Sequence, residues 1–126
     1  ASDVYKRQGI SGTFYSPCSW AYRPSEAVLN DVNADEDMKT GGQIDLLIDR
    51  NDKTVSVCEM KYSSGEYEIT KAYASHVEQR LRTFRKVTST KKSFSIVYVT
   101  PFGLHNNMYA RKVNKQITAD DLFRKV

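Results

Sequence analysis

Residues 41–62 read GGQIDLLIDRNDKTVSVCEMKY, and this stretch decides the expected fold. The apolar run at residues 43–49 and the alternating run at residues 54–62 are both typical of β-strands. The polar cluster at residues 50–53 separates the two runs and has the composition of a turn. We therefore predict a β-hairpin here, and the elements on either side are interpreted around it.

Upstream of the hairpin, we expect one strand and one polar loop. Residues 13–22 mix aromatic and hydroxyl side chains, which favours a strand, and Pro17 would place that strand at a sheet edge or at a bulge. Residues 24–40 are polar and acidic and are expected to form a loop with one helical turn. This loop would connect the first strand to the hairpin.

Downstream of the hairpin, the period of the apolar residues changes from two to about 3.6. Residues 70–87 carry apolar side chains at helical spacing, and Thr70 is suited to cap that helix. Residues 93–100 alternate in polarity and predict a buried strand. We also expect an edge strand within residues 108–114 and a helix that begins at residues 118–121. The order β-β-β-α-β-(β)-α predicts an α/β fold with a mixed β-sheet flanked by helices.

The composition is that of one globular domain. The chain has 126 residues, of which 40% are hydrophobic and 27% are charged, so the composition excludes a disordered chain. No apolar run approaches the roughly 18 residues of a membrane span, and two cysteines do not make a disulfide scaffold. We therefore expect a cytoplasmic protein that has no membrane partner.

The charge is distributed unevenly along the chain. Residues 1–63 carry 7 basic and 10 acidic side chains, whereas residues 64–126 carry 12 basic and 5 acidic ones. The positive second half is compatible with a polyanionic partner, and it is equally compatible with no such partner.

Three charged residues of the hairpin form the candidate site. Val55, Val57, Glu59 and Lys61 share one face of the second strand, because alternate residues of a strand point the same way. The two valines indicate that this face is covered, where a charge is costly unless it is paired or holds an ion. Asp45 interrupts the apolar run of the first strand, and the hairpin can bring it near Glu59.

Two carboxylates beside a lysine suit metal-assisted hydrolysis of a phosphodiester. Mg²⁺ prefers oxygen ligands and is commonly held by one or two carboxylates, and a nearby lysine can stabilise the charge that develops on the phosphate. The alternative is that Glu59 and Lys61 form a surface ion pair on a half-exposed strand. A similar acidic-x-lysine spacing, Asp37-Met38-Lys39, lies in the polar loop and is interpreted as solvated charge.

Residues 41–50 and 57–62 resemble the PD-(D/E)xK nuclease superfamily, and more closely the nuclease-like domain at the C-terminus of certain bacterial AAA-type ATPases. Residues 9–12, 19–22 and 117–123 are similar to further segments of that family. The resemblance implies a restriction-endonuclease-like αβββαβ core. It also implies a hydrolase that cleaves DNA with Mg²⁺ or Mn²⁺ and that is appended to an ATPase domain of the same parent chain.

The resemblance also implies roles for single residues. Asp45 and Glu59 would be metal ligands and catalytic residues, and the carbonyl of Met60 would be a further metal ligand. Lys61 would be catalytic by assisting the attacking water. Gln79 is a possible accessory residue, since a polar helix residue approaches the site in some members of the superfamily.

Basic residues gather at the end of the predicted helix and in the next loop. Six of them fall within 13 positions. They are Arg80, Arg82, Arg85, Lys86, Lys91 and Lys92. One interpretation is that they contact DNA phosphates. The other is a solvated helix face whose cations also suit the C-terminal end of the helix dipole.

The beginning of the chain carries its own expectations. Residues 1–8 read ASDVYKRQ, which matches codon by codon the translation of a transposon-based sequencing adaptor, so we expect an artefact there. Residues 9–126 would then be the C-terminal nuclease-like domain of a longer ATPase-type protein. The first helix of the core, which carries a further glutamate in many members of the superfamily, would lie upstream of Gly9.

Two other functions stay open from the sequence. The domain could be a catalytically inactive nucleic-acid-binding module of that ATPase. It could also be a protein-interaction module, in which Asp45 and Glu59 would be members of structural ion pairs.

Overall fold

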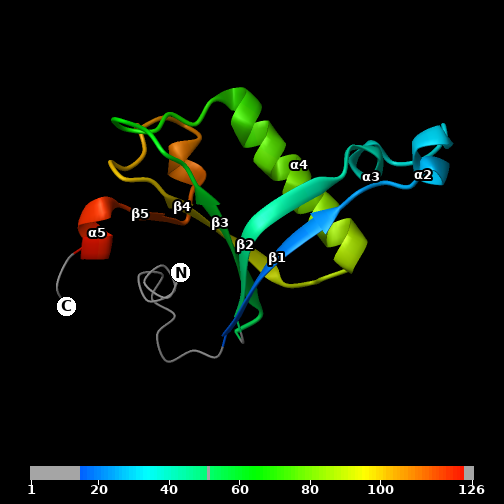
Figure 1. The fold of residues 1–126 in the computed structure, drawn as a ribbon, viewed down its shortest axis with the longest axis horizontal. Coiled ribbons are helices and arrows are strands. Elements are labelled where there is room, and N and C mark those ends of the chain that lie inside the picture. The colour runs from blue at the N-terminus through cyan, green and yellow to red at the C-terminus, as the bar shows by residue number, and fades with distance from the viewer. Residues whose placement is uncertain (1–14, 51, 124–126) are drawn as a thin grey trace.

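The computed structural model describes residues 15–50 and 52–123, without the side chains of residues 15–17 and 122–123 (Figure 1). The expectations for residues 1–8, and for a helix before the first strand, lie outside this described part. Five strands of the described residues form one sheet, in the order β1-β2-β3-β4-β5. They are β1 (Tyr15–Tyr22), β2 (Gly42–Arg50), β3 (Thr54–Met60), β4 (Ser93–Val99) and β5 (Lys115–Ile117).

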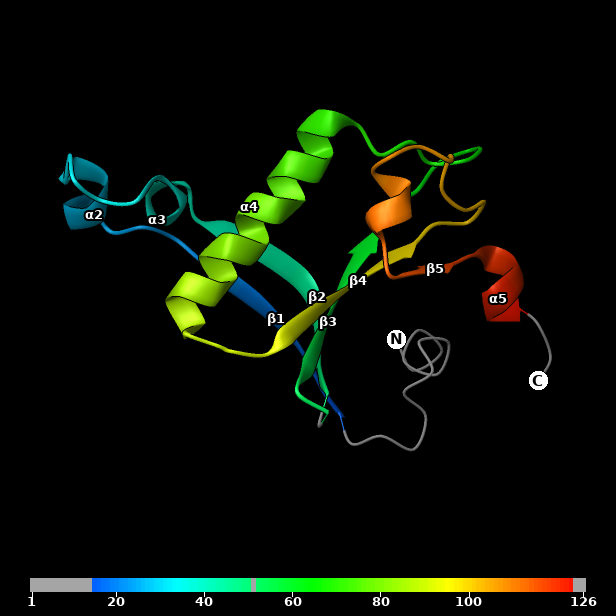
Figure 2. The ribbon, with the colours of Figure 1, turned by 180° about the vertical axis from the view of Figure 1, so that it is seen from behind.

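The sheet is mixed, and one long helix makes the crossover within it. β2 is antiparallel to both β1 and β3, whereas β4 is parallel to β3 and β5 is parallel to β4. Helix α4 (Lys71–Thr88) joins β3 to β4 and lies across one face of the sheet (Figures 1 and 2). The predicted α/β class, with a mixed sheet and flanking helices, is confirmed.

The hairpin forms where the sequence places it. Leu46 pairs with Cys58, Leu47 with Val57 and Asp49 with Val55. The second strand ends at Met60, so Lys61 lies just beyond β3 instead of within it.

A β-bulge in β2 changes which residues face the helix. Cys18 pairs with Leu47 but Trp20 pairs with Ile44, so β2 contains one more residue than β1 over this stretch. As a result Ile44 and Leu47, three positions apart, belong to the same core cluster. The extra residue falls at residues 45–46, which is where the candidate aspartate lies.

The core has apolar clusters on both faces of the sheet. The cluster beneath α4 joins Phe84 of the helix to strand residues. Its buried members are Ile44, Leu47, Val55, Val57 and Phe84. The alternate strand residues form a second cluster on the opposite face, with buried members Ile48, Cys58, Val97 and Ile117.

Helix α4 has the start that the sequence predicts. The Thr70 hydroxyl accepts a hydrogen bond from the backbone N–H of Tyr73 at 3.1 Å, which caps the first turn. Val77 and Phe84 are buried on the sheet side, as the helical spacing predicts. The helix ends at Thr88 and is followed by the C-cap residue Ser89, whose φ of 56° lies in the left-handed region.

Two predictions about the connecting segments are wrong. The loop at residues 24–40 contains two short helices, α2 (Glu26–Asn30) and α3 (Glu36–Thr40), each with a side-chain N-cap. Residues 108–114 form a 3₁₀-helix (Ala110–Lys112) instead of an edge strand. The Asn107 side chain accepts hydrogen bonds from two backbone N–H groups there, which favours a helical turn over an extended chain. The edge strand is β5, which follows this turn and leads into α5 (Ala119–Phe123).

No helix in the described part of the chain is long and apolar enough to cross a membrane.

Candidate active site

Asp45 lies beside a polar cavity between β2 and α4. The β2–β3 register ends at the Leu46–Cys58 pair, next to the bulge, and Asp45 and Glu59 are the next residues of their strands beyond that pair. The Asp45 side chain is exposed, and one of its oxygens, Oδ1, accepts a hydrogen bond from Gln43 Nε2 at 2.8 Å. Asp45 lines a cavity of about 400 Å³ whose helical wall includes His76 and Arg80.

Glu59 is buried and both of its oxygens have partners. Its side chain is 9% exposed, and Oε1 lies 2.8 Å from Nη2 of Arg80. The Tyr73 hydroxyl donates a hydrogen bond to the other oxygen, Oε2, at 2.9 Å. Because both partners belong to α4, the buried carboxylate joins β3 to the helix.

Arg80 also contacts the neighbouring strand. Its Nη1 donates to the backbone carbonyl of Gln43 at 3.1 Å, and its Nη2 lies 3.2 Å from the Tyr73 hydroxyl. One guanidinium therefore connects β2, β3 and α4 at the end of the hairpin where Asp45 and Glu59 lie. A charge-assisted contact of this kind is strong when it is mostly shielded from water.

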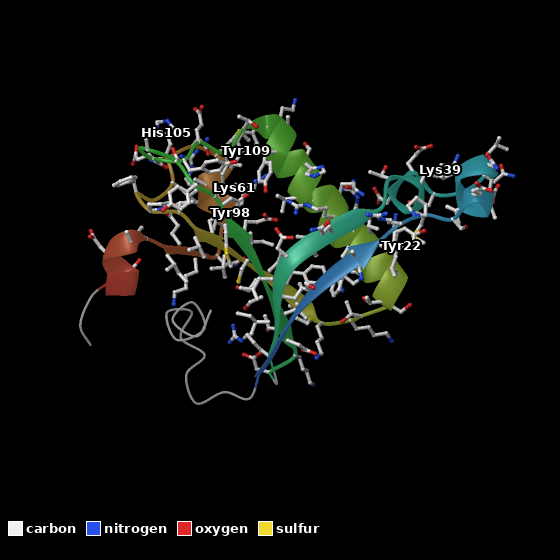
Figure 3. The ribbon with its side chains drawn as sticks, in the orientation of Figure 1. Tyr22, Lys39, Lys61, Tyr98, His105 and Tyr109 are labelled. Carbon is white, nitrogen blue, oxygen red and sulfur yellow. The ribbon has the colours of Figure 1, made fainter. Side chains whose placement is uncertain are left out.

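Lys61 lies over an aromatic cluster next to Glu59. Its Nζ is 4.2 Å from the centre of the Tyr73 ring, a favourable cation–π contact. Tyr67 lies against both Tyr73 and Tyr98, with ring centres 6.4 and 6.3 Å apart. Figure 3 shows Lys61 and Tyr98 together near the end of β3.

The aromatic cluster keeps Lys61 charged. Burial opposes the charge, but Tyr73, Tyr67 and Glu59 together outweigh it, so the pKa of Lys61 lies above its usual value. Burial also raises the pKa of Tyr98 strongly. At neutral pH this part of the site therefore presents an ammonium group, and Lys61 can act as a cation but not as a base.

The structure brings some of the expected residues together and separates others. Glu59, Arg80 and Lys61 gather around Tyr73 at the end of β3, and Asp45 lines the cavity beside Arg80. Met60, which lies between Glu59 and Lys61 in the sequence, is half exposed at the end of β3. The Gln79 side chain donates hydrogen bonds to the carbonyl of Gly41 and the hydroxyl of Thr83, so it contributes to the contact between α3 and α4.

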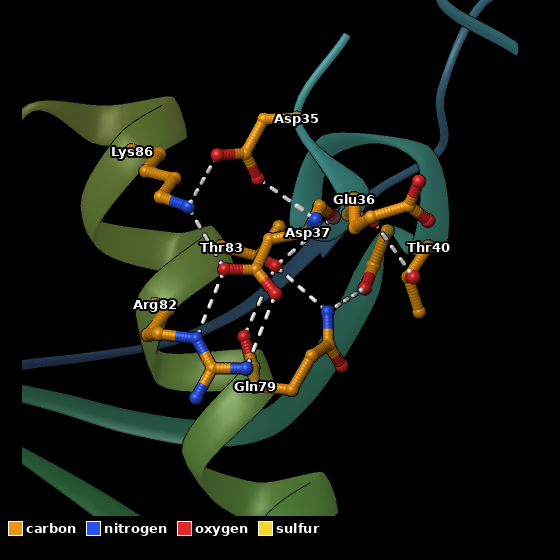
Figure 4. A network of polar contacts seen from close by, with 9 residues as sticks. Asp35, Glu36, Asp37, Thr40, Gln79, Arg82, Thr83 and Lys86 are labelled. Carbon is orange, nitrogen blue, oxygen red and sulfur yellow. Dashed lines mark hydrogen bonds and ion pairs between the residues drawn. The ribbon is translucent and has the colours of Figure 1, made fainter. Parts of the chain in front are cut away.

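Most of the expected DNA-contacting bases have partners within the chain. Arg82 and Lys86 bind the acidic residues of the loop before β2, as Figure 4 shows. Lys92 pairs with Asp49, and Arg85 stacks on the Phe94 ring at 4.3 Å. Of the six bases, the exposed Lys91 comes closest to being an unpaired cation among the described residues. Contact with phosphates stays a prediction for all six.

Asp37 is the centre of the network that holds α3 against α4. Arg82 Nε and Lys86 Nζ each lie 2.9 Å from its Oδ2, and Asp35 takes a second contact from Lys86 at 2.8 Å. These contacts, with Arg82 as the largest cause, lower the pKa of Asp37 from 3.8 to about 2. The interpretation of this residue as solvated charge is therefore wrong, because the loop folds onto the helix.

Asp37→Asn is expected to lower the free energy of unfolding at pH 7 by about 1 kcal/mol, because two ion pairs are lost. The folded pKa of Asp37 is depressed, so its contribution is complete above the unfolded value of 3.8 and is lost as the pH falls through about 2. Urea unfolding at several pH values should therefore show a difference from wild type that shrinks below about pH 4. Glu68→Gln, in the exposed loop before α4, is the control. A difference that persists unchanged at the lowest pH would contradict the assignment.

Sequence reasoning missed the role of Tyr73 and the buried contact of Arg80. The helical spacing assigns Tyr73 to the apolar face, and the ring does lie there. Its hydroxyl and Arg80, seven residues later on the same side of the helix, meet the Glu59 carboxylate. The available signal was a polar atom at each of two positions, seven residues apart, on the side of the helix that faces the sheet.

The chain matches no family model, no curated protein and no solved structure. Among the described residues, no group of three or more His, Cys, Asp or Glu side chains is placed to hold a metal ion. The features that bear on function are therefore the two carboxylates, Lys61 and their neighbours.

Proposed function

We propose that the chain forms a nuclease domain of the PD-(D/E)xK type that hydrolyses DNA phosphodiester bonds with a divalent cation, as part of an ATPase-type parent protein. The single observation that carries the proposal is the placement of Asp45 and Glu59 on neighbouring strands, with Lys61 directly after β3. The order of the described elements also supports it, because three antiparallel strands, a crossover helix and a parallel strand give βββαβ.

The residues at this end of the hairpin have the chemical groups that bind a divalent cation. The carboxylates of Asp45 and Glu59 are the hard oxygen ligands that Mg²⁺ and Mn²⁺ prefer, and the Met60 carbonyl is a further candidate. Glu59 already binds a positive group, the guanidinium of Arg80, at 2.8 Å. A cation that binds Glu59 must therefore compete with the positive charge of Arg80 there. Such an ion would polarise a phosphoryl oxygen and lower the pKa of its bound water.

The protein's own groups would complete the site. Lys61 is held as an ammonium over the Tyr73 ring, where it can stabilise negative charge that develops on a phosphate. Asp45 is exposed at a cavity of about 400 Å³, large enough for a phosphate group with its sugar to approach. Arg23, Arg80 and His76 line the same cavity and would favour an anionic substrate.

Asp45→Asn is expected to reduce metal-dependent DNA cleavage roughly a hundredfold, because the ion loses one negatively charged ligand. The assay follows labelled DNA with Mg²⁺ or Mn²⁺, and with EDTA as the metal-free control. It uses the parent protein, because the proposed nuclease domain is part of an ATPase-type protein. Asp49→Asn, on the same strand with its carboxylate exposed, is the matched variant and should cleave like wild type. Cleavage that survives EDTA, or that both variants lose equally, would contradict the proposal.

A second candidate function is a catalytically inactive module that binds nucleic acid or another protein. The observation that favours it is that both oxygens of Glu59 have partners from the chain itself, so the site is complete as a structural ion pair. DNA binding that neither metal nor Asp45→Asn changes, in the absence of any cleavage, would support the nucleic-acid-binding form of this alternative.

A further inference from the structure

Arg80 is the charged partner of Glu59, one of the two carboxylates of the proposed metal site. Its guanidinium contacts Oε1 of Glu59 at 2.8 Å and the carbonyl of Gln43, two residues before Asp45, at 3.1 Å. The Arg80 side chain is 13% exposed, so water screens this contact weakly. Arg80 also lines the cavity that contains Asp45. The guanidinium therefore binds Glu59 and borders the cavity at which Asp45 is exposed.

A guanidinium and a divalent cation disfavour one another at the same carboxylate. Both are held by the negative charge of Glu59, and two positive groups within a few ångströms repel each other in a partly buried site. The Tyr73 hydroxyl donates to the other oxygen of Glu59, so an ion would have to bind beside the guanidinium or beside this hydroxyl. The guanidinium therefore opposes binding of a cation at Glu59.

The contacts of Arg80 in this position are incomplete. Its Nε is buried and has no hydrogen-bond partner among the described residues. A buried N–H without a partner costs free energy, and movement of the guanidinium into the adjacent cavity would relieve that cost. The same cavity is where a substrate phosphate would approach Asp45.

We propose that Arg80 competes with the divalent cation for Glu59 and so sets the cation affinity of the site. The proposal rests on the metal site of the proposed function. In the wild-type chain, a cation then binds fully only to the small fraction of molecules in which Arg80 has left Glu59. The observed cation affinity is lowered in proportion to that fraction. A phosphate that attracts the displaced guanidinium would increase this fraction, so anionic substrate and cation would bind cooperatively.

Arg80→Gln tests the competition directly by Mn²⁺ binding, followed by electron paramagnetic resonance on the full 126-residue chain. We expect Arg80→Gln to bind one Mn²⁺ about ten- to a hundredfold more tightly than wild type, the usual range for coupled sites. Arg82→Gln removes the same charge from the same helix but contacts Asp37 instead of Glu59, so its Mn²⁺ affinity should equal that of wild type. The double variant Arg80→Gln/Glu59→Gln should lose the gain.

Arg80→Lys is the second variant in case Arg80→Gln does not fold. It keeps the charge, but an ammonium cannot bridge the Gln43 carbonyl and Glu59 as the guanidinium does. We expect an affinity between those of wild type and Arg80→Gln. Affinity equal to that of wild type in the folded variants, or a gain that survives loss of Glu59, overturns the proposal.

Two combinations of results separate the competition at Glu59 from the nuclease activity. Tighter Mn²⁺ binding by Arg80→Gln without DNA cleavage by the parent protein would uphold the competition and refute the nuclease. Metal-dependent cleavage with unchanged Mn²⁺ affinity in Arg80→Gln would uphold the nuclease and refute the competition.

Discussion

Glu59→Ala is expected to lower the free energy of unfolding by about 3 kcal/mol, because it leaves the guanidinium of Arg80 without its counter-ion in a mostly buried place. The side chains of Glu59 and Arg80 are 9% and 13% exposed, so water can replace only part of the lost contact. The Tyr73 hydroxyl also loses its acceptor, which adds to the cost. Urea unfolding of the full chain measures the effect.

The matched variants separate the ion pair from general effects of truncation. Glu68→Ala removes an exposed glutamate from the loop before α4 and should change stability by less than about 0.5 kcal/mol. In the double variant Glu59→Ala/Arg80→Met no charge is left unpaired, so its cost should be smaller than the sum of the two single costs by about 2 kcal/mol. Additive costs would show that Glu59 and Arg80 do not depend on one another.

Lys61→Met is expected to reduce the rate of metal-dependent DNA cleavage about a hundred- to a thousandfold, which is the usual effect of removing one group that stabilises developing charge. Its stability should change by less than about 1 kcal/mol, since Lys61 is partly exposed and methionine can also pack on the Tyr73 ring. Single-turnover cleavage by the parent protein gives the rate, and urea unfolding gives the stability.

Lys39→Met is the matched control for the loss of a lysine. Figure 3 shows Lys39 on α3, at the opposite end of the molecule from Lys61. The control should cleave DNA at the wild-type rate. Equal rates for wild type and Lys61→Met would instead show that the ammonium takes no part in the reaction.

The pH dependence of the reaction provides a further test of Lys61. Burial lowers its pKa, but Tyr73, Tyr67 and Glu59 together raise it further, so the ammonium persists to a higher pH than that of an ordinary lysine. The contribution of Lys61 to cleavage should therefore be constant across neutral pH and be lost only as the pH rises through this raised value. A loss of the contribution near pH 7 would contradict the assignment.

Local patterns predicted most of the elements correctly. The runs at residues 43–49 and 54–62 became β2 and β3, with ends that differ by one or two residues. Thr70 caps α4 as its position before the apolar helix face predicts. These features are determined by residues close together in the chain, namely the period of the apolar side chains and the chemistry of turns and caps.

The wrong predictions concern segments whose structure depends on polar contacts. Residues 108–114 contain apolar residues that are compatible with a strand, but the Asn107 side chain binds the next backbone N–H groups and starts a helical turn. In the loop at residues 24–40, Asp37 binds two cations of α4 and holds α3 to that helix. Composition alone does not indicate which polar group finds a partner.

The sequence by itself determined the hairpin, the crossover helix and the strands that carry Asp45 and Glu59, because those features follow from short-range periodicity. Only the tertiary structure decided which charges meet. The packing of α4 on the sheet brings Arg80 and Tyr73 to Glu59. That pairing depends on the rotation and position of a helix relative to two strands, which no local pattern specifies. The resulting contact pairs Glu59 with Arg80, and the proposed competition with a cation depends on that pairing.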